Sequence, residues 1–543
     1  MREGIEIAFT VMGDANQDLL VDLAERHGIR IVKCRHEQNA VAMADGYCRF
    51  SDDRIGLALV TMGPGLTNTA TSLACAKAHR SSVLLIAGAA SQGELNSPQW
   101  FDQLSFSRLL AGEAGMLEST KSFGLELDRA FGHVRRCAGP YVLNLPGNLQ
   151  NAETPAGWTY RPAYSGHRAT VSCHDDIEHA ARVLVDAHCP AIVAGRGAVL
   201  SKAAQEIIAL ANLLQAPIST TLPAKGLCSG HPLWVGVCGG LGEGVAPDVI
   251  AGCDVVLAIG ASMNQWTTHR CDLVRGKTVI QIDTDSTAFG RHCPADLILP
   301  GDARANLAAL LDVVKSMVPS PRRPDPEVAD HILSLWTKHC APIDYDTGED
   351  DTIDPRQVIR ELDRLLPADR VVVAAGGHAG FSICQLLSVQ RPQNWNYTID
   401  FGSLGQGLGT AIGAAFARPG VRICHITADG EFMMNLQDFH TAVNCVLPLW
   451  VFILNDQGFG QERHDLEHKN LPAHYAMQAS PDFARLAEGF GAKGFRFDTP
   501  NSLKGLEAAL FEADTVRGPV IFDFRINGAY ESPVSQEIAK ALA

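Results

Sequence analysis

The stretch VRICHITADG, residues Val421–Gly430, and the stretch LWVFILNDQG, residues Leu449–Gly458, decide the fold of this chain. Each begins with a predicted apolar strand, Val421–Thr427 in the first and Leu449–Leu454 in the second, and continues into a carboxylate and a glycine. The residues from Asn435 to about Val446 between them are predicted to be helical. A strand, a helix and a strand in this order predict two adjacent parallel strands. Open α/β sheets bind their ligands at the carboxyl ends of such strands. Two carboxylates and a backbone carbonyl at that edge suit a hard cation that also holds phosphate, as magnesium does.

The same alternation of strand, glycine turn and helix continues through the rest of the chain. Continuous apolar runs joined by helices are typical of parallel sheets that are covered on both faces. The interval from Thr61 to Val83 equals the interval from Thr427 to Leu449, and both hold a glycine turn and one helix. We therefore predict an α/β fold of three doubly wound parallel-sheet domains, of which the first and last are similar. The predicted strands are Ile29–Lys33, Ile55–Thr61, Val83–Ala87, Ala191–Ala194 and Ile218–Thr221, and the predicted helices are Asn39–Phe50, Thr67–Ala78 and about Ala203–Leu214.

Two stretches of unusual composition divide the chain. Residues from about Asn151 to His167 are rich in Pro, Gly and Tyr, and residues from about Pro319 to Asp354 are rich in Pro and Asp. Composition shifts of this kind usually mark domain boundaries. We predict domains at residues 1–155, 168–318 and 352–535. The first strand is expected at Ile5–Val11, very near the start of the chain.

The composition argues against several classes of protein. The chain has 543 residues and a net charge of −15, which argues against nucleic acid or an acidic membrane surface as a partner. No apolar stretch is long enough to span a membrane, and no signal peptide is recognisable. The 15 cysteines are scattered without a CxxC pair, so neither a zinc site nor a disulfide framework is predicted. Reduced cysteines favour a cytoplasmic location.

The two strand-end motifs resemble the cofactor motif of thiamine diphosphate enzymes, in which a GDG sequence is followed, one helix and one strand later, by two asparagines. The resemblance implies that Asp429, Asp456 and the carbonyl of Gly458 bind Mg²⁺, and that Gly430 lies beside the diphosphate. Two positions depart from the pattern. Ala428 replaces the first glycine, and Asp456 replaces an asparagine and adds a charge. The alternative interpretation is that both motifs are ordinary turns.

A second motif precedes a predicted helix of the first domain. The sequence CRHEQN, residues Cys34–Asn39, followed by ADGY, residues Ala44–Tyr47, resembles the RHEQ and GYAR segments of acetolactate synthase-like enzymes. In that family the glutamate pairs with N1′ of the cofactor aminopyrimidine, so the resemblance makes Glu37 the catalytic residue. A carboxyl group in an apolar pocket can hold and share a proton with such a nitrogen. The alternative is that Glu37 only stabilises a helix N-terminus through the macrodipole.

A third motif, GSLGQGLG at residues Gly402–Gly409, resembles the GLGTMG segment of the same family. Glycines let the backbone approach a flat ring closely. The resemblance implies that the carbonyl of Gly402 accepts a hydrogen bond from the 4′-amino group and that Leu404 holds the cofactor in its bent conformation. The alternative is a helix that begins close against a strand.

Further cofactor contacts follow from shorter matches. Gly376, Gly377 and His378 resemble a GQH segment that meets the diphosphate, which implicates Gly377 and His378. Phe459 and Gly460 follow directly after the expected metal motif and are expected at the cofactor as well.

The substrate pocket is predicted from two loops of the first domain. The stretch TMGPGLTN, which begins at Thr61, resembles a turn that lines the entrance of the family's active site. The family carries Phe-Gln-Glu after the third strand of this domain, and that triplet is absent here. Gln99, Phe101 and Gln103 occupy the corresponding stretch, and either glutamine could assist carboligation.

The central domain of the family often binds FAD through arginines that follow a strand ending in glycine. The corresponding stretch, Gly260–Trp266, contains no arginine. FAD is therefore doubtful as a cofactor, whereas thiamine diphosphate and Mg²⁺ are expected.

The resemblance implies an enzyme with pyrimidine-binding, central and diphosphate-binding domains. The expected reaction is decarboxylation of a small-molecule 2-oxo acid, with or without carboligation to an acceptor carbonyl. The family's active site lies between two subunits, with Glu37 from one and Asp429 from the other, so a homodimer at least, and a homotetramer by analogy, is expected. The alternatives are a C–C lyase or hydrolase of the same family, a non-catalytic relative that keeps the fold, and a nicotinamide dehydrogenase. A dehydrogenase would need a GxGxxG motif at the start of a first βαβ unit, and this sequence has none there. The sequence identifies neither the donor nor the acceptor.

Overall fold

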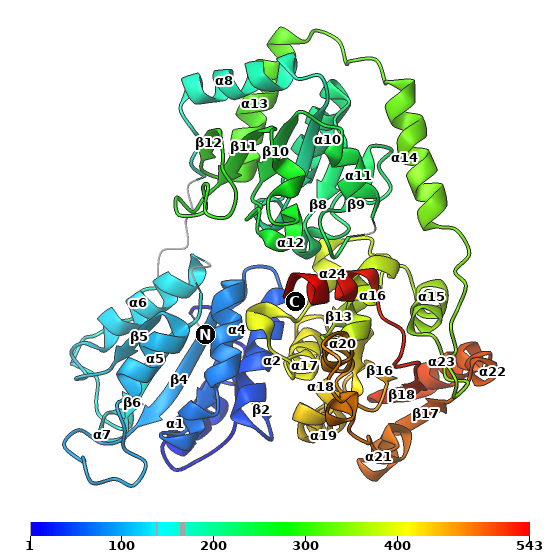
Figure 1. The fold of residues 1–543 in the computed structure, drawn as a ribbon. Helices are drawn as coiled ribbons and strands as arrows, with labels where there is room; N and C mark the ends of the chain where they lie inside the picture. Colours follow the sequence, from blue (N-terminus) through cyan, green and yellow to red (C-terminus); the bar gives the residue numbers. More distant parts are fainter. Residues whose placement is uncertain (1, 137–138, 163–168, 243, 543) are drawn as a thin grey trace.

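The computed structural model describes residues 2–136, 139–162, 169–242 and 244–542. Within these residues it contains three six-stranded sheets in which every strand runs parallel to its neighbours. We refer to the parts that hold the sheets as the N-terminal, central and C-terminal domains. Figure 1 shows the N-terminal and C-terminal domains side by side and the central domain above them. The predicted α/β class with parallel sheets is confirmed.

The N-terminal sheet has the strand order β2-β1-β3-β4-β6-β5. Both of its faces are covered, since Leu57 and Leu59 of β3 enter one hydrophobic cluster while Ala58 and Val60 enter another. The strands are β1 (Ile7–Thr10), β2 (Arg30–Lys33), β3 (Gly56–Val60), β4 (Val83–Ala89), β5 (Glu113–Met116) and β6 (Tyr141–Pro146), and the helices are α1 (Gln17–Glu25), α2 (Glu37–Arg49), α3 (Pro64–Thr67), α4 (Ala70–His79), α5 (Gln103–Ala111), α6 (Phe123–Arg135) and α7 (Gly147–Gln150).

The C-terminal sheet repeats this order strand for strand, as β14-β13-β15-β16-β18-β17. The predicted similarity of the first and last domains is therefore confirmed at the level of topology. Its strands are β13 (Val371–Ala374), β14 (Trp395–Tyr397), β15 (Ile423–Ala428), β16 (Leu449–Asn455), β17 (Lys493–Phe497) and β18 (Val520–Arg525). Its helices are α15 (Pro355–Leu365), α16 (His378–Leu386), α17 (Gly407–Ala417), α18 (Asp429–Asn435), α19 (Phe439–Asn444), α20 (Gly460–His468), α21 (Phe483–Gly489), α22 (Pro500–Leu503), α23 (Leu506–Thr515) and α24 (Pro533–Leu542), with a short 3₁₀ turn, η4 (Asp400–Gly402), before α17.

The central sheet has a different order, β12-β11-β10-β7-β8-β9. Its strands are β7 (Pro190–Ala194), β8 (Ile218–Thr220), β9 (Trp234–Val237), β10 (Val255–Ile259), β11 (Thr278–Asp283) and β12 (Leu297–Pro300), and its helices are α8 (His174–Asp186), α9 (Arg196–Leu200), α10 (Ala204–Leu214), α11 (Val245–Ala251), α12 (Gln265–Thr268) and α13 (Ala303–Met317). Among the described residues, none of the helices combines the length and the apolar character that a membrane span requires.

The two predicted linkers differ in what the structure shows of them. The linker from Asn151 to His167 falls partly on residues 163–168, which lie outside the described part of the chain. The linker from Pro319 to Asp354 contains a helix, α14 (Pro326–His339), which Figure 1 shows alongside the central domain, next to α11. The side chain of Asp325 caps it by accepting a hydrogen bond from the amide of Glu327, and Pro326 occupies its first turn, where the missing N–H does no harm.

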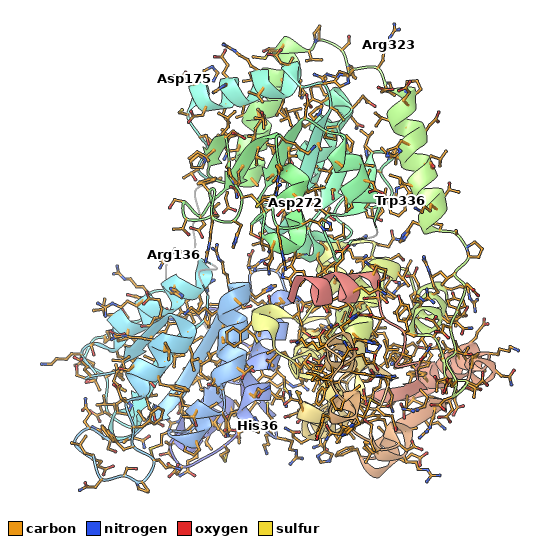
Figure 2. The ribbon with its side chains drawn as sticks, in the orientation of Figure 1. His36, Arg136, Asp175, Asp272, Arg323 and Trp336 are labelled. Atoms are coloured by element: carbon orange, nitrogen blue, oxygen red, sulfur yellow. A yellow bond between two sulfur atoms is a disulfide. The ribbon has the colours of Figure 1, made fainter. Side chains whose placement is uncertain are left out.

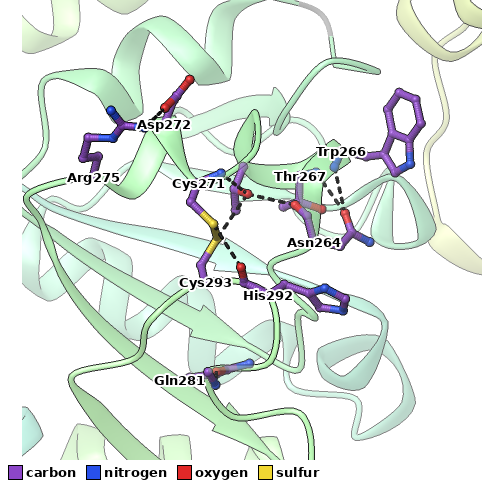
Figure 3. Close-up of a disulfide and its surroundings, with 11 residues drawn as sticks. Asn264, Trp266, Thr267, Cys271, Asp272, Arg275, Gln281, His292 and Cys293 are labelled. Carbon is purple, nitrogen blue, oxygen red and sulfur yellow. Dashed lines mark hydrogen bonds and ion pairs between the residues drawn. A yellow bond between two sulfur atoms is a disulfide. The ribbon is translucent and has the colours of Figure 1, made fainter. Parts of the chain in front are cut away.

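The prediction that the cysteines are reduced is contradicted at one pair in the central domain. Cys271 and Cys293 form a disulfide, with their Cα atoms 5.7 Å apart (Figure 3). The loop that follows β11 folds back towards the turn after α12 and so brings together two residues 22 positions apart. Neither residue belongs to a short Cys spacing, which is the signal on which the prediction relied.

The N-terminal and C-terminal domains share one hydrophobic core. Helices α2 and α17 lie between the two sheets, and a single cluster joins their side chains to Val60 of β3 and Val451 of β16. The helices pack backbone to backbone at two glycines. A Cβ atom added at Gly46 would overlap the backbone of Thr410, and one added at Gly413 would overlap the backbone of Met43. These two domains therefore form one packed unit.

Candidate active site

The two strand-end carboxylates lie next to each other, as the sequence predicts. β15 and β16 pair in parallel with Ala428 opposite Leu454, so Asp429 and Asp456 follow neighbouring strands at the same edge of the sheet. Asp429 is completely buried, and Asp456 is almost so. Asp429 is also the first residue of α18, where a carboxylate is favoured by the helix dipole. The predicted helix from Asn435 to about Val446 thus begins earlier than expected and is divided into α18 and α19.

The two carboxylates are in different electrostatic surroundings. Burial, and then the neighbouring Asp456 carboxylate, raise the pKa of Asp429 above its usual range. Burial alone would also raise the pKa of Asp456, but the hydrogen bond and charge of His378, whose Nδ1 lies 3.0 Å from Asp456 Oδ2, lower it instead. Ser480 donates a hydrogen bond to Asp429 Oδ2, while Asp429 Oδ1 is buried without a partner. Two buried carboxylates with an unsatisfied oxygen are a donor set that a cation would complete.

The third predicted oxygen is close to the same place. A Cβ atom added at Gly430 would lie 3.5 Å from the carbonyl oxygen of Gly458 and 3.0 Å from the ring of Phe459. Gln457 has a φ of 60°, in the left-handed region, which turns the chain after Asp456. Among the described residues, no group of three or more His, Cys, Asp or Glu side chains is arranged to hold a metal ion. A site here would therefore depend on the Gly458 carbonyl as well as on the two carboxylates.

His378 and Gly460 lie against Asp456, and Gly377 directly precedes His378. His378 begins α16 and is buried, and its Nε2 atom has no hydrogen-bond partner. A Cβ atom at Gly460 would overlap both His378 and Asp456, and one at Gly377 would lie 2.9 Å from Ala428 Cβ. Gly377 also has a φ of 108°. Glycine is therefore required at both positions if the histidine and the carboxylate are to meet.

The Gly402–Gly409 motif forms the strained approach to α17. Phe401 has a φ of 62° and Gly402 a φ of 68°. The side chain of Leu404 lies against Gly376, where a Cβ atom would come within 2.5 Å of it. Leu404 and Gly402 both line a cavity of about 820 Å³.

Sequence analysis missed Glu431. Its side chain is buried, Oε1 accepts a hydrogen bond from the amide of Gly407 at 3.1 Å, and Oε2 has no partner. Burial raises the pKa of Glu431 to about 7. The signal in the sequence was an acidic residue two positions after Asp429 in an otherwise apolar segment.

The cavity is enclosed by all three domains. The C-terminal domain contributes Gly377, Gly402 and Leu404, the N-terminal domain contributes Arg49 and His79, and the central domain contributes Asn264 and Trp266. Three predicted cofactor residues thus line the cavity, whereas the predicted metal ligands Asp429, Asp456 and Gly458 are not among its lining residues.

Glu37 is not among the residues that line this cavity. It begins α2, is half-buried, and accepts a hydrogen bond from Asn68 Nδ2 at 3.0 Å. The preceding residue, His36, caps α2 by accepting from the amide of Gln38. Figure 2 shows His36 at the end of the two lower domains that faces away from the central domain. Within one chain, the predicted catalytic residue and the cavity thus lie at different ends of the packed unit.

The four predicted substrate residues also stay within the N-terminal domain. The hydroxyl of Thr61 donates to Asp14 Oδ1 at 3.1 Å, and the Oε1 atom of Gln99 is buried without a partner. Phe101 packs edge-on against the ring of Phe106. Gln103 is buried and its amide is used on the protein itself, because Oε1 accepts from the amide of Gly63 while Nε2 donates to Gly88 and Asn144. Their role in a substrate pocket stays a prediction.

Comparison with known proteins identifies relatives along most of the chain. Acetolactate synthase isozyme 3 large subunit of Escherichia coli is 28% identical over 546 residues, which cover 97% of this chain and 93% of that protein. A probable acetolactate synthase large subunit of Methanocaldococcus jannaschii is 26% identical over 98% of this chain and 91% of its own length. Sulfoacetaldehyde acetyltransferase of Castellaniella defragrans is 28% identical over 91% of this chain and 86% of its own length.

Three family descriptions match the three sheets in turn. Residues 1–106 match the thiamine pyrophosphate enzyme N-terminal TPP binding domain, residues 177–310 the central domain, and residues 375–524 the C-terminal TPP binding domain. Thiamine pyrophosphate is another name for thiamine diphosphate. The matches follow one another in the order of the family and cover most of the chain, so this chain belongs to the thiamine pyrophosphate-dependent enzymes of the acetolactate synthase-like kind.

Proposed function

We propose that the protein uses thiamine diphosphate and Mg²⁺ to decarboxylate a 2-oxo acid and to transfer the remaining acyl unit to an acceptor carbonyl. The observation that carries this proposal is a set of buried polar atoms without partners at one sheet edge, namely Asp429 Oδ1, Glu431 Oε2 and His378 Nε2. Buried polar groups are normally hydrogen-bonded, so these three suit an additional polar group. Carboxylate oxygens, a carbonyl and a glycine-lined approach are what a magnesium diphosphate requires.

Each residue has a distinct part in this proposal. Asp429, Asp456 and the carbonyl of Gly458 hold Mg²⁺, and His378 both steadies Asp456 and faces the diphosphate. Gly377, Gly430 and Gly460, with Phe459 beside them, leave room for the phosphate groups. When bound, the cofactor supplies the electron sink that decarboxylation of a 2-oxo acid needs. Gly402 and Leu404 orient its aminopyrimidine, and the Glu37 carboxyl holds the proton at N1′.

The proposed enzyme is a homodimer at least, and a homotetramer by analogy with the family. The position of Glu37 supports this, because in one chain it lies away from the cavity that Gly402 and Leu404 line. A partner's N-terminal domain would bring a second Glu37 to that cofactor, with Thr61, Gln99 and Phe101 beside it. The many free cysteines among the described residues fit the cytoplasm.

Two experiments test the proposal in sequence. Calorimetric titration with thiamine diphosphate in the presence of Mg²⁺ should show saturable binding that disappears when the metal is chelated. A panel of 2-oxo acids, alone and with acceptor aldehydes or 2-oxo acids, should then release carbon dioxide with one preferred donor, and product analysis identifies the acceptor. Binding of the cofactor with turnover of no 2-oxo acid would favour the alternatives of a C–C lyase or hydrolase.

A further inference from the structure

Residues 400–406, which we call the glycine loop, lead from the end of β14 to α17 in a strained conformation. Phe401 and Gly402 are consecutive residues with positive φ, at 62° and 68°. The ring of Phe401 is 67% exposed, so packing of its own side chain does not hold the turn. A non-glycine residue in this region persists only where the surroundings determine its conformation. The contacts that hold the glycine loop must therefore come from its other residues.

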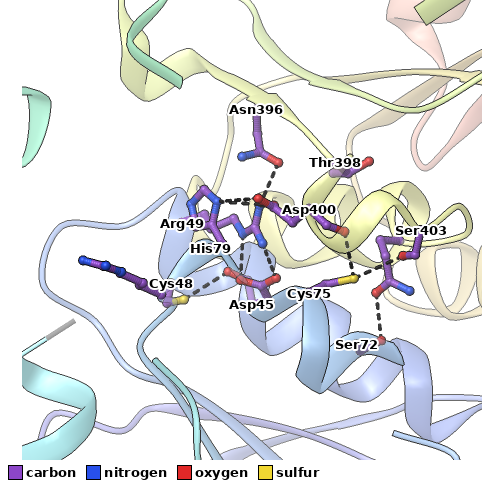
Figure 4. A network of polar contacts seen from close by, with 12 residues as sticks. Asp45, Cys48, Arg49, Ser72, Cys75, His79, Asn396, Thr398, Asp400 and Ser403 are labelled. Atoms are coloured by element: carbon purple, nitrogen blue, oxygen red, sulfur yellow. Dashed lines mark hydrogen bonds and ion pairs between the residues drawn. The ribbon is translucent and has the colours of Figure 1, made fainter. Parts of the chain in front are cut away.

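The loop begins at Asp400, which is anchored to the N-terminal domain of the same chain (Figure 4). Arg49 Nη1 donates to Asp400 Oδ2 at 2.6 Å, and His79 Nδ1 lies 3.4 Å from Asp400 Oδ1. Nε and Nη2 of Arg49 donate hydrogen bonds to Oδ1 and Oδ2 of Asp45, at 2.7 and 2.6 Å. The guanidinium of Arg49 is buried, and its bidentate ion pair with Asp45 fixes its orientation toward the loop.

Burial alone would raise the pKa of Asp400, but the charge of Arg49 and the contact with His79 hold it well below its usual range. Burial, and then Arg49, lower the pKa of His79 to about 4, so this histidine is neutral near pH 7 and its Nδ1–H can donate to the carboxylate. The anchor is thus one cation and one neutral donor on a single anion.

The rest of the loop is held by one face of α4. Cys75 Sγ lies 3.3 Å from the carbonyl oxygen of Asp400 and 3.1 Å from Ser403 Oγ. Ser72 Oγ donates to Gln406 Oε1 at 2.8 Å. Ser72, Cys75 and His79 are spaced by three and four residues and therefore share one side of the helix. Ser72 contacts the end of the loop, Cys75 its middle and His79 its start.

We propose that Arg49 and this face of α4 position the glycine loop of the same chain, so that Gly402 and Leu404 can hold the aminopyrimidine of the cofactor. The inference rests on the proposed function, since it concerns how that site is shaped. Arg49, Ser72, Cys75 and His79 act through the loop and are positioning residues. Each N-terminal domain then serves two sites in the dimer, because its Glu37 reaches the partner's cofactor while its α4 shapes the loop of its own chain.

The decisive variant is Asp400→Asn, which keeps the size of the side chain and removes its charge. Its matched control is Asp363→Asn in α15. Asp363 pairs with the buried Arg370, and the exposed fractions of the two arginine–aspartate pairs are nearly the same, at 3% and 21% for Arg370 and Asp363 and 5% and 23% for Arg49 and Asp400. Asp363 bonds to Arg370 and Ser388 and does not contact the glycine loop. Both variants should lower the unfolding temperature by similar amounts.

Thiamine diphosphate affinity, measured by calorimetry with Mg²⁺ present, separates the two variants. Asp400→Asn should weaken binding about 10- to 100-fold, by analogy with the loss when a residue that orients a metal ligand is changed, whereas Asp363→Asn should bind as the wild type does. Equal affinity in both variants would overturn the inference.

A second pair of variants decides the matter if Asp400→Asn does not fold. Cys75→Ala removes the contacts to Asp400 and Ser403 and should weaken cofactor binding, while Cys75→Ser keeps a donor and should restore most of it. Failure of serine to restore binding, or unchanged binding in the alanine variant, would overturn the inference and leave the proposed function intact. A wild-type protein that binds no thiamine diphosphate would refute the proposed function and this inference with it.

Discussion

The N-terminal and C-terminal sheets have the same strand order, but they differ in the burial of the carboxylates at the carboxyl ends of their strands. In the C-terminal sheet, the third and fourth strands are followed by the buried carboxylates Asp429 and Asp456. In the N-terminal sheet, the equivalent β3 is followed by Thr61, whose hydroxyl is bonded to the exposed carboxylate of Asp14. The two carboxylates of the C-terminal edge are buried away from water, whereas Asp14 beside Thr61 is exposed to it.

This difference shows that the fold fixes where a site is and the loop residues fix what it does. Both sheets place the residues of the proposed site after the carboxyl ends of their strands, where open α/β sheets bind ligands. The C-terminal edge suits a cation, because burial, and then the charge of Asp456, raise the pKa of Asp429, and a bound positive charge would offset both effects. Glu37, the acid that we propose for the N-terminal domain, instead lies at the start of a helix.

The largest effect is expected when one of the two buried carboxylates of the C-terminal edge is removed. Asp429→Ala should abolish retention of thiamine diphosphate, because the predicted metal site loses one of its two carboxylates and the Ser480 hydroxyl beside it carries no charge to replace that ligand. The loss in affinity should be at least about 100-fold, the upper end of what residues behind a metal ligand cost. Equilibrium dialysis measures it. Asp14→Ala, the matched change at the other edge, should leave the affinity unchanged, and an Asp429→Ala protein with wild-type affinity would contradict the assignment.

The next effect tests the contribution of the N-terminal domain. Glu37→Gln keeps the size of the side chain and its hydrogen bond from Asn68 but cannot exchange a proton with N1′. Turnover should fall about 10²- to 10⁴-fold, the typical contribution of a general acid–base group. The unfolding temperature should hardly change, since the side chain is half-buried and keeps its partner. Glu6→Gln, an exposed carboxylate of the same domain, is the control, and near wild-type turnover in Glu37→Gln would refute the role.

A smaller effect is expected at Asp456, the second carboxylate of the C-terminal edge. Asp456→Asn should remain active, because the amide still offers an oxygen, while Mg²⁺ affinity weakens by about tenfold with the loss of one charge. The pKa of Asp456 is lowered by His378, so the carboxylate stays ionised as the pH falls until it passes that pKa, and metal binding is lost below it. In Asp456→Asn this protonation is removed, and the loss of metal at acidic pH should become less steep. If Asp456 only holds a turn, Asp456→Ala would bind Mg²⁺ and cofactor as the wild type does, which titration of both ligands decides.

The smallest effect concerns the central sheet, whose strand order differs from the other two. The stretch Gly260–Trp266 after β10 contains no arginine and begins the short helix α12 at Gln265. We expect the purified protein to be colourless and to turn over without added flavin. A stoichiometric flavin absorbance band would show that the central sheet binds the dinucleotide after all.

Much of the fold could be predicted because the strands are continuous apolar runs. β15 and β16 lie within one or two residues of the predicted Val421–Thr427 and Leu449–Leu454. Neighbouring strand ends could also be inferred, because a strand–helix–strand unit puts them at one edge. The start of α18 at Asp429 was missed, since a glycine directly after an aspartate reads as a turn when neighbours in space are unknown.

The contacts between domains could not be predicted. Arg49 and Asp400 are 351 positions apart, and Cys271 and Cys293 meet only because of how a loop folds. Local periodicity carries no information about such pairs. Glu431 was visible as an acid in an apolar segment, but its burial beneath the glycine loop depends on α17, which packs there through tertiary contacts.

The close approach of α2 and α17 has a consequence for how such chains can be recombined. The backbones of α2 and α17 touch at Gly46 and Gly413, so that a side chain at either position would overlap the other helix. A chimera that takes its first domain from one parent and its last from another would need a glycine at both crossing points. The central domain meets a similar limit at one place, because a Cβ atom added at Gly226 would come within 2.8 Å of the carbonyl oxygen of Val389. Chimeric enzymes of this family should therefore take both outer domains from one parent, and should take a central domain that keeps a glycine at the position of Gly226.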